Sequence, residues 1–266
     1  MNGCSFCIYS GESVGIIGSS GTGKSTTLRL AAGLLEPDAG EIIIKGRPRQ
    51  GLLSDDDTSD KLKIGLVFQS GALFDSLSVK ENVGFVLYEH TALPDEEIDR
   101  CIADALAKVG LSGVEDLYPS ELSGGMKKRV ALARAIVQDS SSNGDVEQCI
   151  MYDEPTAGLD PVASTVVEDL IRSMHDPRFV RNAKGSEGSR ESTASGAIQL
   201  QEGCGVSSYV VVTHQHSTIR RSVDRIIFLN QGRVVWEGSV ADFERTEEPI
   251  VKQFRQGSLD GPIAYV

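Results

Sequence analysis

The sequence has few basic residues for its length, and it contains no long apolar run. Its 266 residues carry 26 Lys and Arg against 38 Asp and Glu, a formal net charge of −12. Because a protein surface that follows the phosphates of a duplex needs clustered cations, this balance argues against a broad nucleic-acid surface. No apolar run approaches the roughly 18 residues of a membrane span, so any transport across a membrane requires separate spanning subunits.

Cysteine is also scarce. The chain has five, at irregular spacing: Cys4, Cys7, Cys101, Cys149 and Cys204. An odd number without a regular pattern indicates a reducing compartment rather than a disulfide framework. Cys4 and Cys7 form a C-x-x-C, but no second pair and no histidine lies at ligand spacing. An edge strand is therefore the favoured interpretation of this segment over a metal or redox site.

The most informative stretch matches the phosphate-binding pattern G-x-x-x-x-G-K-[ST]. It lies between an apolar strand at 14–17 and a helical pattern at 24–34, as the pattern requires. Glycine lets successive backbone N–H groups point at phosphate oxygens, and the helix N-terminus adds its positive end. We expect Lys24 to neutralise the β- and γ-phosphates and Ser25 to coordinate Mg²⁺. The predicted nucleotide-binding residues of this loop are Gly18, Ser19, Ser20, Gly21, Thr22, Gly23, Lys24, Ser25 and Thr26.

A second anion-binding helix start is predicted at Ser123, where a helix begins that runs to about Gln138. Ser123 supplies a hydroxyl, and Gly124 and Gly125 supply unshielded N–H groups. The next residues include three cations: Lys127, Lys128 and Arg129. Cations in a first helical turn oppose the helix dipole. We interpret them as a solvated face, with attraction to phosphate or to acidic neighbours as the alternative.

Two adjacent carboxylates, Asp153 and Glu154, end the apolar segment 149–152. Because side chains alternate along a strand, the two point in different directions. This suits Asp153 as a partner of the metal and Glu154 as the base that takes a proton from attacking water. Without the other motifs, two carboxylates capping a surface strand would be the default interpretation.

These motifs, in this order, resemble the ATP-binding cassette family over nearly the whole chain. The resemblance implies ATP and Mg²⁺ at the site and ATP hydrolysis as the activity. It implies that Gln69 lies in the glutamine loop, which contacts Mg²⁺ or water and senses the membrane partner. Asp160 matches the loop that crosses between subunits, and His214 matches the switch histidine at the γ-phosphate; His216 is expected to be a surface residue. The catalytic candidates are Glu154, His214 and Gln69, and the metal-binding candidates are Ser25, Gln69 and Asp153.

Finer details resemble the Mla-type lipid-transport branch of that family. The stretch that begins at Ser123 matches the family's signature motif. A methionine and two lysines follow its glycines, Gly124 and Gly125, where most cassette proteins are glutamine-rich. The stretches 68–79 and 257–263 also fit this branch, and 213–221 leans toward the plastid trigalactosyldiacylglycerol-type lipid importers. The resemblance implies an ATP-hydrolysing subunit that powers a transporter of phospholipids or galactolipid precursors. The alternative is a soluble cassette ATPase that acts as a scaffold or assembly factor without a permease.

The resemblance also implies partners. Because the signature helix addresses the γ-phosphate held on a second subunit, one chain supplies two half-sites, and we predict a homodimer. A multi-span permease, a mammalian-cell-entry-type lipid-binding subunit and peripheral membrane association are further implied. The implied location is the stromal face of the chloroplast inner envelope, or alternatively the cytoplasmic face of a bacterial inner membrane. Apolar residues beyond Gln69 are expected to divide between a permease socket and the helical core: Leu73, Phe74, Leu77 and Val79.

The expected fold class is α/β, a P-loop NTPase core with a RecA-like sheet, flanking helices and an inserted helical signature subdomain. We expect one domain over 1–266. Its predicted parts are a nucleotide-binding core at 1–72 and 140–240, a helical subdomain at 73–139, a flexible insertion at 176–207 and a C-terminal tail at 241–266. Core strands are predicted at 14–17, 41–45, 63–68, 149–153, 209–213, 225–230 and 234–236, and an amphipathic helix at 95–109.

The residues before Gly18 are too few for the family's first strand and its adenine-stacking aromatic. Phe6 and Tyr9 have the character of strand residues, and neither is assigned to the base.

Overall fold

The computed structural model describes residues 1–266 except 50, 53–61, 138–146, 176–205 and 264–266. Its centre is a six-stranded sheet in the order β4-β5-β6-β1-β7-β8, in which β8 is antiparallel to β7 and the other neighbours are parallel. The strands are β1 (Ser13–Ile17), β4 (Leu62–Val67), β5 (Glu147–Asp153), β6 (Val206–Val212), β7 (Arg225–Asn230) and β8 (Arg233–Ser239). Together with its helices, this sheet confirms the predicted α/β fold.

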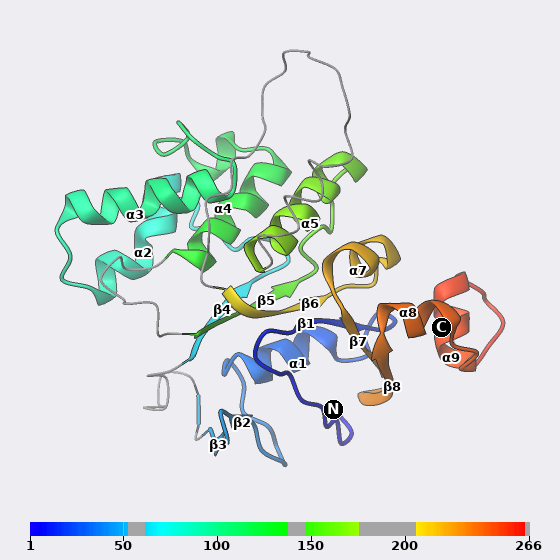
Figure 1. The fold of residues 1–266 in the computed structure, drawn as a ribbon. Helices are drawn as coiled ribbons and strands as arrows, with labels where there is room; N and C mark the ends of the chain where they lie inside the picture. The colour runs from blue at the N-terminus through cyan, green and yellow to red at the C-terminus, as the bar shows by residue number, and fades with distance from the viewer. Residues whose placement is uncertain (50, 53–61, 138–146, 176–205, 264–266) are drawn as a thin grey trace.

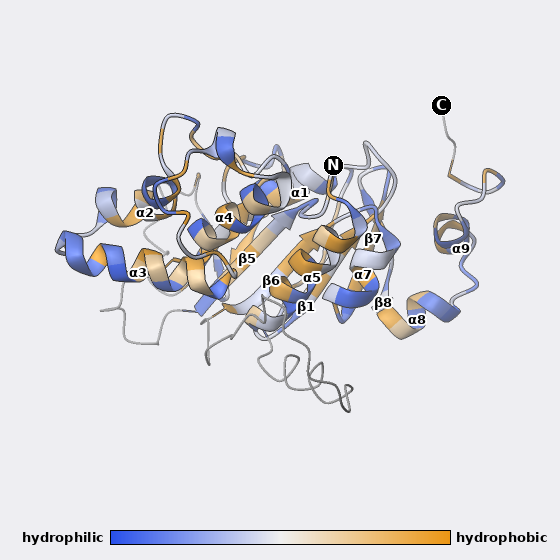
Figure 2. Cartoon of the chain, turned by 90° about the horizontal axis from the view of Figure 1, so that it is seen from above, coloured by the Kyte–Doolittle hydropathy of each residue, from blue (hydrophilic) through white to orange (hydrophobic). Residues whose placement is uncertain are grey.

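Helices cover both faces of the sheet (Figure 1). They are α1 (Lys24–Ala31), α2 (Val79–His90), α3 (Asp95–Lys108), α4 (Gly124–Ile136), α5 (Pro161–His175), α7 (His216–Ser222), α8 (Val240–Arg245) and α9 (Pro249–Gln256), with a 3-10 turn η3 (Pro119–Glu121). Alternate residues of β5 enter different cores: Ile150 joins the core that includes residues of α2–α5, and Met151 joins the core that includes Leu28 of α1. Figure 2 shows the apolar strands in the middle and polar outer surfaces on α2 and α3.

The helices between β4 and β5 follow local sequence signals. Ser78 and Glu81 form a capping box at the start of α2. The first turn of α3 is acidic, and its buried face includes Ile98 and Leu106, so the predicted amphipathic helix is confirmed, with its last helical residue at Lys108. In the described part of the chain, no helix is both long enough and apolar enough to span a bilayer.

The predicted core strand at 41–45 is wrong. This segment contributes only β2 (Ile43–Ile44), which pairs with β3 (Arg47–Pro48) in a separate two-stranded sheet. The reason is a tight turn: Lys45 and Gly46 both have positive φ, 48° and 79°, which is the geometry of a two-residue hairpin. The chain therefore folds back on itself before it can enter the main sheet. The other six predicted core strands are present.

The predicted edge strand at Cys4 and Cys7 is also wrong, because residues 1–12 form no strand. Cys4, Phe6 and Ile8 are partly buried against the core on the α1 side, and the carbonyl of Cys7 accepts a hydrogen bond from Arg225. Side-chain packing and a guanidinium thus replace the pairing with a neighbouring strand. The predicted insertion at 176–207 lies outside the described residues except for its last two, which begin β6.

Candidate functional site

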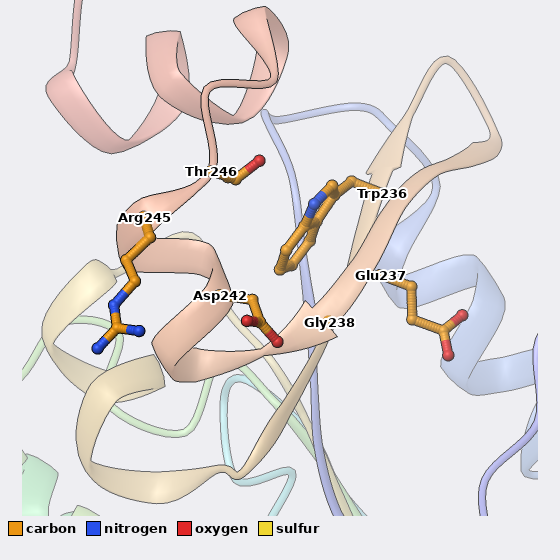
Figure 3. A pocket seen from close by; sticks show the side chains of 6 residues that line it. All are labelled: Trp236, Glu237, Gly238, Asp242, Arg245 and Thr246. Atoms are coloured by element: carbon orange, nitrogen blue, oxygen red, sulfur yellow. The ribbon is translucent and has the colours of Figure 1, made fainter.

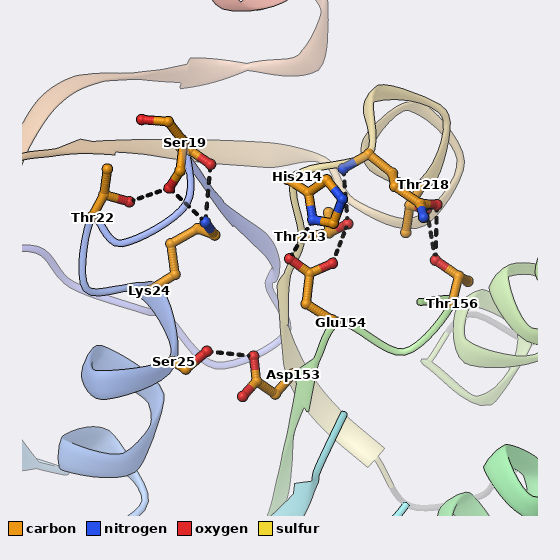
Figure 4. Close-up of polar contacts among 12 residues, drawn as sticks. Ser19, Thr22, Lys24, Ser25, Asp153, Glu154, Thr156, Thr213, His214 and Thr218 are labelled. Atoms are coloured by element: carbon orange, nitrogen blue, oxygen red, sulfur yellow. Dashed lines mark hydrogen bonds and ion pairs between the residues drawn. The ribbon is translucent and has the colours of Figure 1, made fainter. Parts of the chain in front are cut away.

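Four of the predicted site segments follow four adjacent parallel strands. The phosphate loop follows β1, Gln69 follows β4, Glu154 follows β5 and His214 follows β6. The carboxyl ends of parallel strands lie at the same edge of a sheet, which is where open α/β sheets bind their ligands. Strand order therefore gathers residues from four distant parts of the chain, and Figure 4 shows the loop, Glu154 and His214 close together.

The phosphate loop is held by its own side chains. Lys24 is only 8% exposed, and its ammonium donates to the main-chain carbonyls of Gly18 and Ser19, both at 2.9 Å. The Thr22 hydroxyl donates to the same Ser19 carbonyl at 2.9 Å. Burial lowers the pKa of Lys24, and the charges of Glu154 and Asp153 oppose that shift. A buried ammonium so close to the loop backbone is suited to a phosphate ligand.

Gly18 is required by a close approach between two strand ends. Its φ is +152°, and a Cβ at this position would lie 2.1 Å from the carbonyl oxygen of Leu229 on β7. By contrast, a Cβ at Gly21 would meet no atom within 4 Å, although its φ of +76° still favours glycine. Packing thus demands glycine at position 18, and the backbone angle favours glycine at position 21.

Ser25 and Asp153 supply the oxygen atoms expected for a magnesium ion. The Ser25 hydroxyl donates to Asp153 Oδ1 at 2.8 Å, and Asp153 is 6% exposed. Among the described residues, no group of three or more His, Cys, Asp or Glu could hold a metal. Mg²⁺ needs no such group, because phosphate and water oxygens complete its shell beside one or two protein oxygens. The pair fits the ion. The Gln69 side chain is exposed and makes no hydrogen bond to either residue.

Glu154 is fixed by residues that follow β6. Its Oε1 lies 2.7 Å from Nδ1 of His214, and its Oε2 accepts from the Thr213 hydroxyl at 3.3 Å. Its φ is 48°, a left-handed value that typically costs about 1–3 kcal/mol outside glycine, and its N–H donates to the Val212 carbonyl at 2.8 Å. Both the backbone and the carboxylate of Glu154 are therefore held in place. Sequence reasoning missed Thr213, because nothing local marks a threonine at a strand end as a partner of a carboxylate.

The glycines of the signature motif pack against the segment around Asp160. A Cβ on Gly124 would lie 3.5 Å from Leu159, and a Cβ on Gly125 would lie 3.6 Å from Ala163. Ser123 caps α4 by accepting from the Met126 N–H at 3.2 Å. Asp160 likewise caps the next helix, since its Oδ1 accepts from the N–H groups of Val162 and Ala163, both at 2.9 Å.

The signature motif and the phosphate loop do not meet within one chain. α1, which follows the phosphate loop, and α4, which begins at the signature motif, lie on opposite faces of the sheet (Figure 1). The helices that begin at the two sets of predicted nucleotide-contacting residues therefore lie on different faces of the sheet.

Lys128 does not belong to a solvated face, so that interpretation is wrong for this residue. It is 8% exposed, and its ammonium donates to the main-chain carbonyls of Gln69 and, at 3.5 Å, of Glu154. Arg129 also faces the protein, donating to the Gly110 carbonyl at 3.0 Å. The sequence signal that could have identified this burial is the unfavourable position of these cations at a helix start, which calls for nearby acceptors.

A hollow of about 330 Å³ lies on β8 and α8 and holds none of the predicted site residues (Figure 3). It is lined by Trp236, Glu237, Gly238, Asp242, Arg245 and Thr246.

Comparison with known proteins agrees with this geometry. The family model described as "ABC transporter" matches residues 1–157. The chain is 54% identical to Protein TRIGALACTOSYLDIACYLGLYCEROL 3, chloroplastic, from Arabidopsis thaliana, over 100% of this chain and 71% of that protein. It is 33% identical to the intermembrane phospholipid transport system ATP-binding protein MlaF from Haemophilus influenzae, over 97% of this chain and 85% of that protein.

Among solved structures, it resembles a dimeric post-hydrolysis state of an ATP-binding cassette bound to ADP and Pi. The TM-score is 0.68 at 29% identity, covering 89% of each chain. The chain is therefore an ATP-binding and ATP-hydrolysing protein that belongs to the ABC transporter family.

Proposed function

We propose that this chain is the ATP-hydrolysing subunit of a membrane lipid transporter. One observation carries the catalytic part of the proposal: a buried carboxylate, Glu154, is held beside the phosphate loop by His214 and Thr213. The transport part is supported by the relatives, whose names include a chloroplastic trigalactosyldiacylglycerol protein and an intermembrane phospholipid transport system.

In the proposed mechanism, the role of each residue follows from its position in the structure. Lys24 and the loop N–H groups bind the β- and γ-phosphates. Glu154 accepts a proton from the attacking water, and His214 orients that carboxylate and contacts the γ-phosphate. Ser25 and Asp153 would hold Mg²⁺, which neutralises charge on the phosphate oxygens when it is bound. Gln69, exposed at the end of β4, would contact water or the ion when the dimer closes.

The active form in this proposal is a homodimer. Because α4 lies on the face of the sheet opposite α1, the Ser123 and Gly125 groups would address the phosphate of a second copy. Asp160 would lie at the crossing between the copies, next to the signature glycines on which its loop packs. The dimeric cassette with ADP and Pi supports this arrangement.

The proposed partners are a multi-span permease and a mammalian-cell-entry-type lipid-binding subunit. The chain would lie peripherally on the stromal face of the chloroplast inner envelope, and the name of the chloroplastic relative supports the organelle. A permease socket is supported by exposed aromatic side chains: Phe74 is 45% exposed and Phe85 is 37% exposed, with ring centroids 5.0 Å apart. Val79 is fully buried and belongs to the helical core instead.

The catalytic assignment is tested by Glu154→Gln. Loss of a general base lowers turnover by about 100-fold or more, while ATP binding is retained. The matched control is Glu147→Gln, at the first residue of the same strand, which pairs with Lys45 at 39% side-chain exposure. Single-turnover hydrolysis and equilibrium ATP binding are measured on both variants. An unchanged turnover for Glu154→Gln would remove the assignment.

The transport assignment is tested by a mild-detergent pull-down of the tagged chain from its native membranes, with mass spectrometry of the bound proteins. A multi-span permease and a single-span lipid-binding subunit at stoichiometric levels are the expected result. Soluble partners alone would favour a scaffold role and would leave the ATPase chemistry intact. Phe74→Ala should weaken permease retention without lowering ATP hydrolysis by the isolated chain.

A further inference from the structure

Lys128 links three parts of the molecule. Its side chain comes from the second turn of α4, and its ammonium donates to the carbonyl of Gln69 after β4 and to the carbonyl of Glu154 after β5. Both acceptors are main-chain atoms, so the contact depends on the position of the backbone and not on the identity of a side chain. One cation therefore holds the ends of two neighbouring strands against one helix.

Lys128 lies in a setting that disfavours its charge. Burial lowers the pKa of Lys128, and the charges of Glu154 and Asp153 oppose that shift. Burying an ammonium is costly, and the two carbonyls that accept from Lys128 offset part of that cost. A methionine would fill a similar space but would leave both carbonyls without this donor, whereas an arginine could still donate to them.

The segment around Gln69 packs closely against α4. Arg134, further along the helix, donates to the carbonyls of Gly71 and Ala72, both at 2.8 Å. Gly71 has a φ of +78°, and a Cβ there would lie 3.5 Å from Ala131 on α4. Among the described residues, the hydrogen bonds of Arg134 go to this segment, whereas Lys128 also donates to the Glu154 carbonyl. A displacement of α4 would therefore move the Gln69 backbone and, through the hydrogen bond of Lys128, the Glu154 backbone.

We propose that Lys128 is a positioning residue for ATP hydrolysis in its own subunit, which holds the Gln69 and Glu154 backbones in register with α4. The inference rests on the proposed roles of Gln69 and Glu154. The same helix begins with Ser123, whose proposed ligand is the phosphate on the other subunit. Engagement of the partner's ATP at the first turn of α4 is thereby transmitted to the chain's own Glu154 through the second turn.

The test compares three variants of the full chain: Lys128→Met, Lys128→Arg and the control Lys127→Met. Lys127 is the adjacent cation and is half-buried. For Lys128→Met we expect kcat to fall about 10-fold or more, since small misplacements in an active site have effects of up to about 100-fold. The KM for ATP should stay within about 2-fold, and the denaturant midpoint should fall, because two carbonyls lose their donor. Lys128→Arg should recover most of kcat, and Lys127→Met should match the unmodified chain.

An unchanged kcat for Lys128→Met would overturn the proposal. A kcat that falls together with a rise in the KM for ATP, without recovery by arginine, would also overturn it, because that pattern indicates a general loss of structure. Mixed dimers in which one copy carries Glu154→Gln sharpen the test, because only the other copy can then hydrolyse ATP. Lys128→Met should lower kcat when it lies in the copy with the intact Glu154. It should not do so when it lies in the Glu154→Gln copy, which supplies only the signature motif. If Glu154→Gln itself hydrolyses ATP normally, the proposed site fails first, and that result is distinct from a failure of Lys128 alone.

Discussion

Nδ1 of His214 lies 2.7 Å from Oε1 of Glu154, although the two residues are 60 positions apart in the sequence. The histidine side chain is 53% exposed, and the glutamate side chain is 10% exposed. The contact therefore joins an accessible imidazole to a sheltered carboxylate at the edge of the sheet. Such a pair can keep the carboxylate aimed while its partner remains free to meet a ligand.

Removal of this imidazole should lower turnover. His214→Ala is expected to lower kcat by about 10²–10⁴-fold, the range for a lost acid–base or orienting partner, with ATP binding retained. The control is His216→Ala, because His216 lies 3.0 Å from Glu244 and packs on Phe243, away from Glu154. Steady-state hydrolysis of the two variants decides the matter. Equal losses in both would point to a general effect on the fold and against the role of His214.

Loss of the Asp153 carboxylate should weaken the response to magnesium. Asp153→Asn is expected to raise the Mg²⁺ concentration for half-maximal hydrolysis by about 10-fold or more, as for other changes near metal ligands. Asp169→Asn serves as control, since Asp169 pairs with Arg221 on the surface of α5. Hydrolysis is followed across a Mg²⁺ titration. Superimposable titration curves for Asp153→Asn and the unmodified chain would contradict the assignment.

The packing of the C-terminal helices on the rest of the protein should contribute to stability through Phe243. This side chain is fully buried in α8 and packs on Trp236 and His216. Phe243→Ala is expected to lower the free energy of unfolding by about 3–5 kcal/mol, from lost burial and the cavity that remains. Leu259→Ala, at a side chain that is 83% exposed, should change it by less than about 0.5 kcal/mol. Chemical denaturation of both variants measures the difference.

Stability should fall in alkaline solution because of Cys149. Burial raises the pKa of this thiol, and a hydrogen bond with Ser208 opposes the shift. Below the ordinary thiol pKa of about 8.5 both states are protonated, so nothing is lost. Above it the unfolded thiol ionises while the folded one does not, and stability decreases by up to about 1.4 kcal/mol per pH unit.

The measurement is the free energy of unfolding between pH 7.5 and pH 10 for the unmodified chain and for Cys149→Ala. The alanine variant should start lower and decline less steeply, because it lacks the titrating group. Parallel slopes in the two proteins would show that Cys149 does not contribute to the decline.

The phosphate loop could be predicted because its requirements are local. Glycines at fixed spacing, a preceding apolar strand and a following helix lie within one short stretch around Lys24, and the structure has the same order. The helix α3 could be predicted for the same reason, because its acidic first turn and its apolar stripe are local signals. Its last residue lies one position before the predicted end. The segment 41–45 misled, because a short apolar run has the same composition in a hairpin as in a core strand.

The amino-acid sequence by itself determined which strand ends carry polar groups and which helices begin with residues predicted to bind anions. Those properties depend on neighbours in the chain and on backbone angles. Only the tertiary structure decided that His214 meets Glu154, that Lys128 is buried against two carbonyls, and that α1 and α4 take opposite faces of the sheet. Such contacts depend on strand order and register, which arise from packing between segments far apart in the chain.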